Sequence, residues 1–389
     1  MSEGIPAKNF GFGEDEQMLR DVARKFLDEK LPVQTLRDLV AQDPDAVYER
    51  GEPTRWDEGL WKQMVELGWT GLAVPEAHGG LGFKLAGIVG LVEELGRHAA
   101  PTPLIATLNA TYVLAACDGD NASSALGKIA DGATASLAIT DAKGSWDASA
   151  CDVSAASDGD DVVLSGTAYF VQDAAKAELF VTLAERGSEL ILCVVRSDAQ
   201  GVSIERDHIH DLTRDQARVV FDHVQVAAVD VVSEEAKSPL ARAWASVLVT
   251  VSADLCGCGE WQLQATVEYA KNRKQFEHQL GFFQAVKHPL VNAMMEIDRA
   301  RSLVYHAASC VDAGSDEATT ASRMAKSAAS DAGAFMSDRS VQLHGGIGFT
   351  WESDVHLFFK RSMHNQALYG DGSYQRRLLA ETLIGPIEG

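Results

Sequence analysis

The spacing of apolar residues changes twice along this 389-residue chain, and that change constrains the fold more than any other feature. Apolar side chains recur at helical intervals over residues 19–27 and 88–95, and the helical character continues to about Asp131. Over residues 135–227 the pattern becomes short runs of Val, Leu, Ile and aromatic residues separated by Gly, Asp and Ser. Helical spacing returns from about Pro239. The sequence therefore predicts two helical parts on either side of a β part.

We expect a mainly α-helical fold with a middle β domain, large enough to bury a sizeable core. The predicted boundaries are an N-terminal helical domain over residues 1–131, a β domain over 132–232 and a C-terminal helical domain over 233–389. In the last of these, apolar residues over 286–304 alternate steps of four and three, as in a helix packed in a bundle. Pro289 lies near the start of that helix, where its missing N–H costs little.

Composition argues against several classes of protein. The formal net charge of −22 argues against a nucleic-acid binder, which would show a basic face. It also means that an anionic ligand needs locally placed Arg or Lys side chains. The amino terminus lacks the features of a signal peptide, and charged residues interrupt the most apolar stretch, residues 240–261. We expect a cytoplasmic protein that binds neither nucleic acid nor membrane.

The cysteines and histidines predict no metal site. Cys256 and Cys258 are the only close pair among six cysteines, and on a helix they would point to different faces. No second pair or His partner follows at zinc-site spacing. We expect both cysteines to be small core or interface residues.

Two glycine-marked turns lie about 20 residues apart near the carboxyl terminus. The first is Gly345-Gly346-Ile347-Gly348 and the second is Tyr369-Gly370-Asp371-Gly372, with a helical run between them. Such turns can place backbone close to a flat or phosphorylated ligand, and they can equally be two helix C-caps. The spacing alone leaves both interpretations open.

Residues 342–361 carry a resemblance to a known family. QLHGGIGFTWE followed by HLFFKR is similar to the carboxyl-terminal signature of acyl-CoA dehydrogenases, FAD enzymes that oxidise acyl-CoA thioesters to 2-enoyl-CoA. Residues 68–83 and 212–227 resemble two further segments of the family, in the same order. The resemblance implies a β-barrel-like middle domain and a C-terminal four-helix bundle that also builds the oligomer. It also implies FAD as cofactor, acyl-CoA as substrate and electron-transferring flavoprotein as electron acceptor.

The part of the family pattern that contacts the FAD adenosine and pyrophosphate is well kept. NRKQFEHQLGFFQAVKH, residues 272–288, resembles a stretch that reaches across a dimer interface to the neighbour's FAD. The resemblance assigns this contact to seven residues: Arg273, Gln275, Phe276, Gln284, Gln342, Gly345 and Gly346. A guanidinium can fork onto phosphate oxygens, and glycines let backbone N–H groups approach them. Glu277, where the family usually has Gly, adds a negative charge nearby.

The part that should contact the flavin ring is altered. Residues 140–146, TDAKGSW, are shorter than the family's Thr-Glu-Pro-Gly-Ala-Gly-Ser-Asp and lack its proline. Phe170-Val171-Gln172 replaces a Trp-Ile-Thr segment that packs against the ring. Phe can still cover an apolar ring edge and Gln can still donate a hydrogen bond, but an ordinary β strand explains the segment equally well.

The sequence has no ionisable side chain at the position of the family's catalytic base. The family's Glu aligns with Gly370, and Asp371 beside it would point elsewhere or cap the following helix. The other place where relatives carry the base falls near Val247, and a neighbouring family Arg falls near Leu248. His344 lies within the glycine signature and is at most an indirect contributor. We therefore predict no catalytic residue in this chain, with Asp371 as the alternative base.

These observations lead to one hypothesis with two alternatives. The chain resembles the partner subunit of an α2β2 acyl-CoA dehydrogenase of bacterial sterol or bile-acid side-chain degradation. It would donate Arg273, Phe276, Gln284 and Gln342 to FAD held mainly by a homologous subunit that carries the Glu. The alternatives are a self-sufficient flavoenzyme that uses Asp371 and a catalytically silent scaffold subunit.

Overall fold

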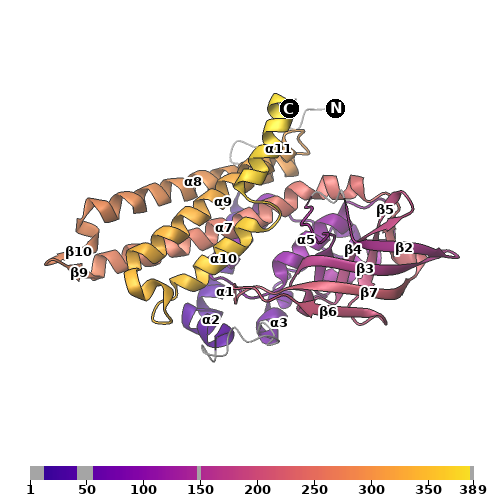
Figure 1. The fold of residues 1–389 in the computed structure, drawn as a ribbon, viewed down its shortest axis with the longest axis horizontal. Helices are drawn as coiled ribbons and strands as arrows, with labels where there is room; N and C mark the ends of the chain where they lie inside the picture. Colours follow the sequence, from indigo (N-terminus) through magenta and orange to yellow (C-terminus); the bar gives the residue numbers. More distant parts are fainter. Residues whose placement is uncertain (1–12, 42–55, 147–149, 386–389) are drawn as a thin grey trace.

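A computed structural model of the chain describes residues 13–41, 56–146 and 150–385. Residues 1–12, on which the signal-peptide prediction depends, lie outside the described residues. Figure 1 shows a β-sheet at one end of the molecule and long helices that extend away from it toward the other end. The predicted order of helical, β and helical parts is confirmed.

The N-terminal part consists of helices. They are α1 (Glu14–Lys30), α2 (Val33–Val40), α3 (Glu58–Glu66), α4 (Leu85–Arg97), α5 (Leu104–Ala115) and α6 (Ser123–Ala130), with a short 3-10 turn at Glu76–His78. Helix α4 is the central one, because all of its residues except Arg97 are buried. The helices predicted over residues 19–27 and 88–95 fall within α1 and α4.

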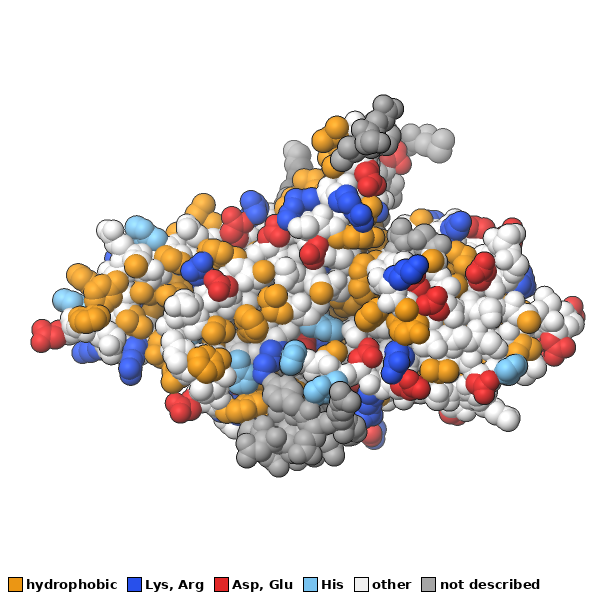
Figure 2. All heavy atoms as spheres, viewed as in Figure 1, with side chains coloured by type: hydrophobic (Ala, Val, Ile, Leu, Met, Phe, Trp, Pro, Cys, Tyr) orange, Lys and Arg blue, Asp and Glu red, His pale blue; other side chains and the backbone are white. Residues whose placement is uncertain are grey.

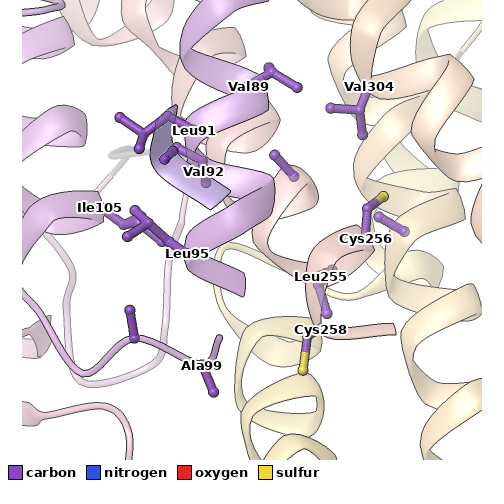
Figure 3. Packing of buried hydrophobic residues seen from close by; sticks show 14 of the residues in the cluster. Val89, Leu91, Val92, Leu95, Ala99, Ile105, Leu255, Cys256, Cys258 and Val304 are labelled. Carbon is purple, nitrogen blue, oxygen red and sulfur yellow. The ribbon is translucent and has the colours of Figure 1, made fainter. Parts of the chain in front are cut away.

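Helix α4 packs closely against α7 (Lys237–Asn272), and two glycines make this contact possible. A Cβ atom at Gly96 would lie 2.2 Å from the Asp254 carbonyl oxygen, and one at Gly257 would lie 1.8 Å from the Glu93 carbonyl oxygen. Any larger residue at either position would force the helices apart. Figure 3 shows apolar side chains of α4, Cys256 and Cys258 of α7 and Val304 in this packed region. The prediction that both cysteines are core residues is confirmed.

The middle part is one sheet. Its strands are β1 (Ala135–Ala138), β2 (Val153–Asp158), β3 (Asp161–Gln172), β4 (Leu179–Arg186), β5 (Glu189–Arg196), β6 (Val202–Arg206), β7 (Gln216–Val226) and β8 (Val231–Ser233). The strand order is β6-β7-β3-β2-β4-β5-β8, and β1 pairs with β4 in parallel. The five predicted strands correspond to β1, β3, β4, β5 and β7. Strands β2, β6 and β8 were not predicted, because most residues of β2 and β6 are exposed and β8 has only three residues.

Helices return after the sheet. Besides α7 they are α8 (Gln284–Asp312), α9 (Ala318–His344), α10 (Val355–Ala367) and α11 (Gly372–Ile384), with 3-10 turns at Leu280–Phe282 and Gly345–Phe349. Strands β9 (Lys274–Gln275) and β10 (His278–Gln279) form a hairpin between α7 and α8. By length and composition α7 could cross a membrane, but 83% of its most apolar window is buried inside the protein. Helix α7 is therefore a core helix.

A buried ion pair joins the three parts of the chain. Arg361 of α10 and Asp254 of α7 are both 0% exposed, and the guanidinium donates to the carboxylate at 2.7 and 3.1 Å. Arg361 also donates to the Ala100 carbonyl and the Thr213 hydroxyl, and Arg214 donates to Asp254 at 2.8 Å. Burial alone would raise the pKa of Asp254, but the two guanidinium groups outweigh it and hold that pKa below its usual value.

Candidate functional site

The seven residues predicted to contact the FAD adenosine and pyrophosphate are all exposed at one end of the helical bundle. We call them the bundle-end group: Arg273, Gln275, Phe276, Gln284, Gln342, Gly345 and Gly346. They come from the end of α7, the β9–β10 hairpin, the start of α8, and the end of α9 with the turn that follows. The structure thus brings together two segments that are about 60 residues apart in the sequence.

A contact between α7 and α9 holds these two segments at the same end. The Tyr269 ring stacks on the His344 ring with their centroids 4.3 Å apart, and its hydroxyl donates to the His344 carbonyl at 3.4 Å. His344 itself is buried, and its Nδ1 lies 2.8 Å from the Ser340 carbonyl oxygen. Burial lowers the pKa of His344. His344 therefore supports the turn at Gly345 from below as a neutral ring.

The hairpin presents an aromatic residue and a strained turn to solvent. Phe276 is 85% exposed, and Phe276 and Glu277 both have positive φ angles, of +51° and +64°. Non-glycine residues seldom adopt this conformation, because Cβ crowds the backbone. Figure 2 shows hydrophobic side chains gathered at this end of the bundle, where Phe276 and Phe282 are both exposed.

The bundle-end group has the chemistry that a nucleotide pyrophosphate needs. Arg273 forms no ion pair within the described residues, so its guanidinium is available to an anion. A Cβ atom at Gly345 or Gly346 would meet nothing within 4 Å, so the backbone there faces open space. These residues fit the adenosine and pyrophosphate half of FAD.

The polar side chains predicted to contact the flavin ring form hydrogen bonds within this chain instead. The Gln172 amide donates to the Phe170 carbonyl at 3.0 Å and to Gln216 at 2.9 Å, and its oxygen lies 2.8 Å from His364 Nε2. The Asp141 carboxylate accepts from the Ser145 backbone and hydroxyl at 2.8 and 2.9 Å. Because these polar groups are already used inside the chain, this half does not fit a flavin ring.

A row of aromatic side chains spans the boundary between the sheet and the bundle. Trp146 lies 5.9 Å from Phe170 and 5.6 Å from Tyr369, and Tyr369 lies 5.3 Å from Trp244, as measured between ring centroids. Phe170 belongs to β3, Trp146 to the loop after β1, Trp244 to α7 and Tyr369 to the turn between α10 and α11. We call these four residues the aromatic bridge.

Gly370 is buried directly under a ring. A Cβ atom at this position would lie 2.2 Å from Tyr374 Cδ1, and the φ angle of Gly370 is +90°. A glutamate side chain could not enter this place unless Tyr374 and the backbone moved. The turn therefore leaves no room for a longer side chain at position 370 in this structure.

The alternative base, Asp371, caps a helix. It is the N-cap of α11, and its Oδ1 accepts a hydrogen bond from the Tyr374 backbone N–H at 2.8 Å. This confirms the capping interpretation of Asp371. Val247 and Leu248, at the other family position, are buried among apolar side chains together with Tyr369.

Sequence reasoning missed a buried lysine beneath the same turn. Lys326 of α9 is 0% exposed, and its ammonium donates to the carbonyl oxygens of Asn365, Gln366 and Gly370 at 2.9 to 3.1 Å. Burial lowers the pKa of Lys326 to about 7, against the opposing effect of the Asp371 charge. No motif marks this lysine, because its partners are backbone carbonyls whose positions only the fold decides.

One group of three potential metal ligands lies within the described part of the chain. The ligand atoms of His306, Cys310 and Glu317 all lie within 4.8 Å of one another on α8 and the loop after it. None of the three belongs to the bundle-end group or the aromatic bridge.

The two predicted halves of the flavin site are far apart within one chain. Figure 1 shows the β9–β10 hairpin at one end of the molecule and the sheet that contains β3 at the other. One copy of this fold therefore cannot close both halves on the same flavin. A flavin contacted by both segments would have to lie between two chains.

Comparison with known proteins identifies the family. Residues 13–132 match the acyl-CoA dehydrogenase N-terminal domain and residues 249–384 match the acyl-CoA dehydrogenase C-terminal domain. The chain is 31% identical over 375 residues to acyl-CoA dehydrogenase IpdE2 of Mycobacterium tuberculosis. The alignment covers 96% of this chain and 99% of the relative. The chain thus belongs to the acyl-CoA dehydrogenase family, whose members are FAD-dependent oxidoreductases.

Solved structures agree with this fold. The chain is 28% identical to one in a variant of the Tcur3481-Tcur3483 steroid ACAD, with a TM-score of 0.84 over 96% of this chain and 98% of the other. A chain of the ChsE4-ChsE5 complex from Mycobacterium tuberculosis has a TM-score of 0.86 at 23% identity, over 97% of this chain and 99% of the other. The predicted family and fold class are confirmed.

Proposed function

We propose that this chain is the non-catalytic subunit of a heteromeric FAD-dependent acyl-CoA dehydrogenase. It supplies the adenosine and pyrophosphate contacts, through the bundle-end group, to FAD held mainly by a homologous subunit. That homologous subunit supplies the carboxylate that removes the α-proton of the acyl-CoA. The observation that carries this proposal is the pairing of an available bundle-end group with a buried Gly370 that has no room for a carboxylate.

The reaction explains why the missing carboxylate matters. Dehydrogenation of an acyl-CoA needs a base for the weakly acidic α-proton, and bound FAD accepts the hydride from the β-carbon. Val247 and Gly370 hold no proton acceptor at either family position. The carboxylate of Asp371 caps α11, which counts against a self-sufficient enzyme that uses this residue.

Relatives support the heteromeric assembly and the substrate class. Two of the similar structures are described by pairs of chains, Tcur3481-Tcur3483 and ChsE4-ChsE5, and the first is described as a steroid ACAD. We therefore propose a bulky steroid side-chain acyl-CoA as substrate, a heterotetramer as the assembly, electron-transferring flavoprotein as the acceptor, and a cytoplasmic location.

Expression with and without a partner tests the proposal. The chain is purified alone and together with a homologous chain that carries the Glu, and the flavin absorbance per mole of protein and the acyl-CoA oxidation are measured. We expect a colourless, inactive chain alone and about one FAD per pair of chains in the complex. A yellow, active homo-oligomer made from this chain alone would refute the proposal.

Two substitutions then locate the base. Changing the partner's Glu to Gln should abolish turnover while the bound FAD is retained. Asp371→Asn should leave turnover unchanged, because an asparagine can cap α11 equally well. Loss of turnover in Asp371→Asn with FAD retained would favour the self-sufficient enzyme instead.

A further inference from the structure

We propose that Trp146, Tyr369 and Trp244 act as an internal stopper that keeps the acyl thioester of CoA out of this chain's own interdomain boundary. Substrate would then bind only at the boundary of the homologous subunit. This inference rests on the proposed function and adds a physical cause for it. It concerns exclusion of the substrate, a property separate from the absence of the base.

The chemistry of the reaction says where the substrate would have to lie. The α-carbon must face the base and the β-carbon must face the flavin ring, so the reacting carbons lie between these two groups. In this chain the base positions are Gly370 and Val247 on the bundle side, and the ring-facing segment is Phe170-Val171-Gln172 on the sheet side. An acyl chain in this subunit would therefore have to pass between β3 and the start of α7.

The aromatic bridge fills that path. Ring contacts run from Phe170 through Trp146 to Tyr369 and on to Trp244, with each neighbouring pair of centroids 5.3 to 5.9 Å apart. Trp244 lies one helical turn before Val247, and Tyr369 immediately precedes Gly370. The row thus reaches from the ring-facing strand to both base positions, and Tyr369 is only 6% exposed.

Several groups hold Tyr369 in the path. Its carbonyl accepts from Gln375 Nε2 at 2.8 Å, and the carbonyl of Gly370 accepts from the Lys326 ammonium at 3.0 Å. The Tyr369 hydroxyl hydrogen-bonds with Asn109, and burial raises the pKa of Tyr369 to about 12, so the ring stays neutral.

The backbone of Tyr369 indicates that this position is enforced. Its φ angle is +58°, a left-handed conformation that is unfavourable for a residue with a Cβ. Such a residue persists only where its surroundings fix it, and strained residues of this kind concentrate at functional positions. The two hydrogen bonds to the turn and the rings on either side supply that restraint.

Ordinary packing between domains is the alternative explanation, and ligand binding separates the two. If the rings only stabilise the boundary, removing them lowers stability without creating a binding site. If they exclude the substrate, removing them creates a site for an acyl thioester that the wild-type chain lacks. A non-oxidisable alkyl thioether of CoA is a suitable probe, because its binding needs neither a base nor turnover.

The experiment uses the full chain alone and titrates hexyl-CoA thioether by calorimetry. We expect one site per chain in the double variant Trp146→Ala/Tyr369→Ala, and binding to the wild-type chain that is at least about 10-fold weaker. Trp261→Ala is the matched control, because it removes an equally large ring that stacks on Phe358 at 3.6 Å, outside the aromatic bridge. This control should gain no site.

The milder pair Trp146→Leu/Trp244→Leu keeps the boundary apolar and is used if the double alanine variant does not fold. Wild-type binding as tight as that of the opened variants would overturn the inference, as would folded opened variants without a new site. Flavin content of the co-expressed wild-type complex distinguishes the two proposals. If the wild-type complex holds one FAD per pair of chains and the opened variants gain no site, the stopper is refuted and the proposed function stands. If the wild-type chain alone contains flavin and is active, the proposed function is refuted.

Discussion

The bundle-end group and the aromatic bridge lie in the two regions where we predicted contacts to the flavin, yet they differ in exposure, packing and hydrogen bonding. The bundle-end residues are exposed, Arg273 forms no ion pair within the described residues, and the glycines face open space. At the aromatic bridge the rings pack on one another, and Gln172 beside them is fully hydrogen-bonded within the chain. One region can stay accessible to a ligand while the other is packed within the chain, because different elements carry them.

The largest expected effect tests how much the buried Arg361–Asp254 ion pair, which joins the three parts of the chain, stabilises the molecule. Arg361→Ala leaves the buried Asp254 carboxylate without its bidentate partner, and we expect it to lower the free energy of unfolding by about 3–5 kcal/mol. Urea denaturation measures this loss. The control Arg196→Ala removes an exposed partner of Asp198 and should change stability little. A small effect of Arg361→Ala would mean that this ion pair does not hold the three parts of the chain together.

Two glycine substitutions compare the turn that follows Tyr369 with the bundle-end group. Gly370→Ala places a methyl group 2.2 Å from the Tyr374 ring at a φ of +90°, and we expect a loss of about 2–4 kcal/mol from overpacking and backbone strain. Gly346→Ala, where a Cβ meets nothing within 4 Å, should change stability by less than about 0.5 kcal/mol. Urea denaturation of both variants measures the two losses of stability. Equal losses would show that the Gly370 turn is no more tightly packed than the turn at Gly346.

Arg273→Ala tests the bundle-end group by its effect on FAD affinity. A hydrogen bond to a charged group contributes about 1.5–3 kcal/mol, so we expect the co-expressed complex to hold FAD roughly 10- to 100-fold more weakly. Flavin absorbance during dialysis measures this change. Lys274→Ala, an equally exposed cation next to it, is the matched control and should affect FAD less. Stability of the isolated chain should not change in either variant, and unchanged FAD affinity in Arg273→Ala would contradict the assignment.

The smallest expected effect is the pH dependence of stability that Lys326 causes, since its ammonium binds the Gly370 carbonyl. Its pKa in the folded protein, about 7, lies below the usual lysine value, so the unfolded chain binds more protons between these two values. Stability should therefore rise with pH above 7, by up to about 1.4 kcal/mol per pH unit. Urea denaturation at pH 7, 8 and 9 measures the slope. Lys326→Met should remove this contribution, and the exposed-residue control Lys271→Met should keep it. An identical slope in Lys326→Met and wild type would show that Lys326 does not titrate in this range.

Local patterns predicted the elements that bury one face, because burial selects apolar residues at fixed intervals. The helices over residues 19–27 and 286–304 were found in this way, whereas the strands β3 to β5 were found from runs rich in Val, Leu, Ile and aromatic residues. Strands β2 and β6 escaped because most of their residues are exposed and they need no apolar run. The hairpin at Gln275 and His278 also escaped, because its turn uses Phe276 and Glu277 at positive φ where Gly or Asn is usual.

Residue types in their order along the chain predicted the family and the order of helical and β parts, because a local pattern is enough for each. They also led to the hypothesis that Gly370 stands in place of the catalytic carboxylate. The folded structure was needed to show that the Tyr374 ring lies against Gly370, that the Lys326 ammonium binds the Gly370 carbonyl, and that Tyr369 lies between Trp146 and Trp244. These contacts join residues up to about 220 positions apart. Packing of distant elements creates them, and no local pattern along the chain encodes which distant side chains will meet.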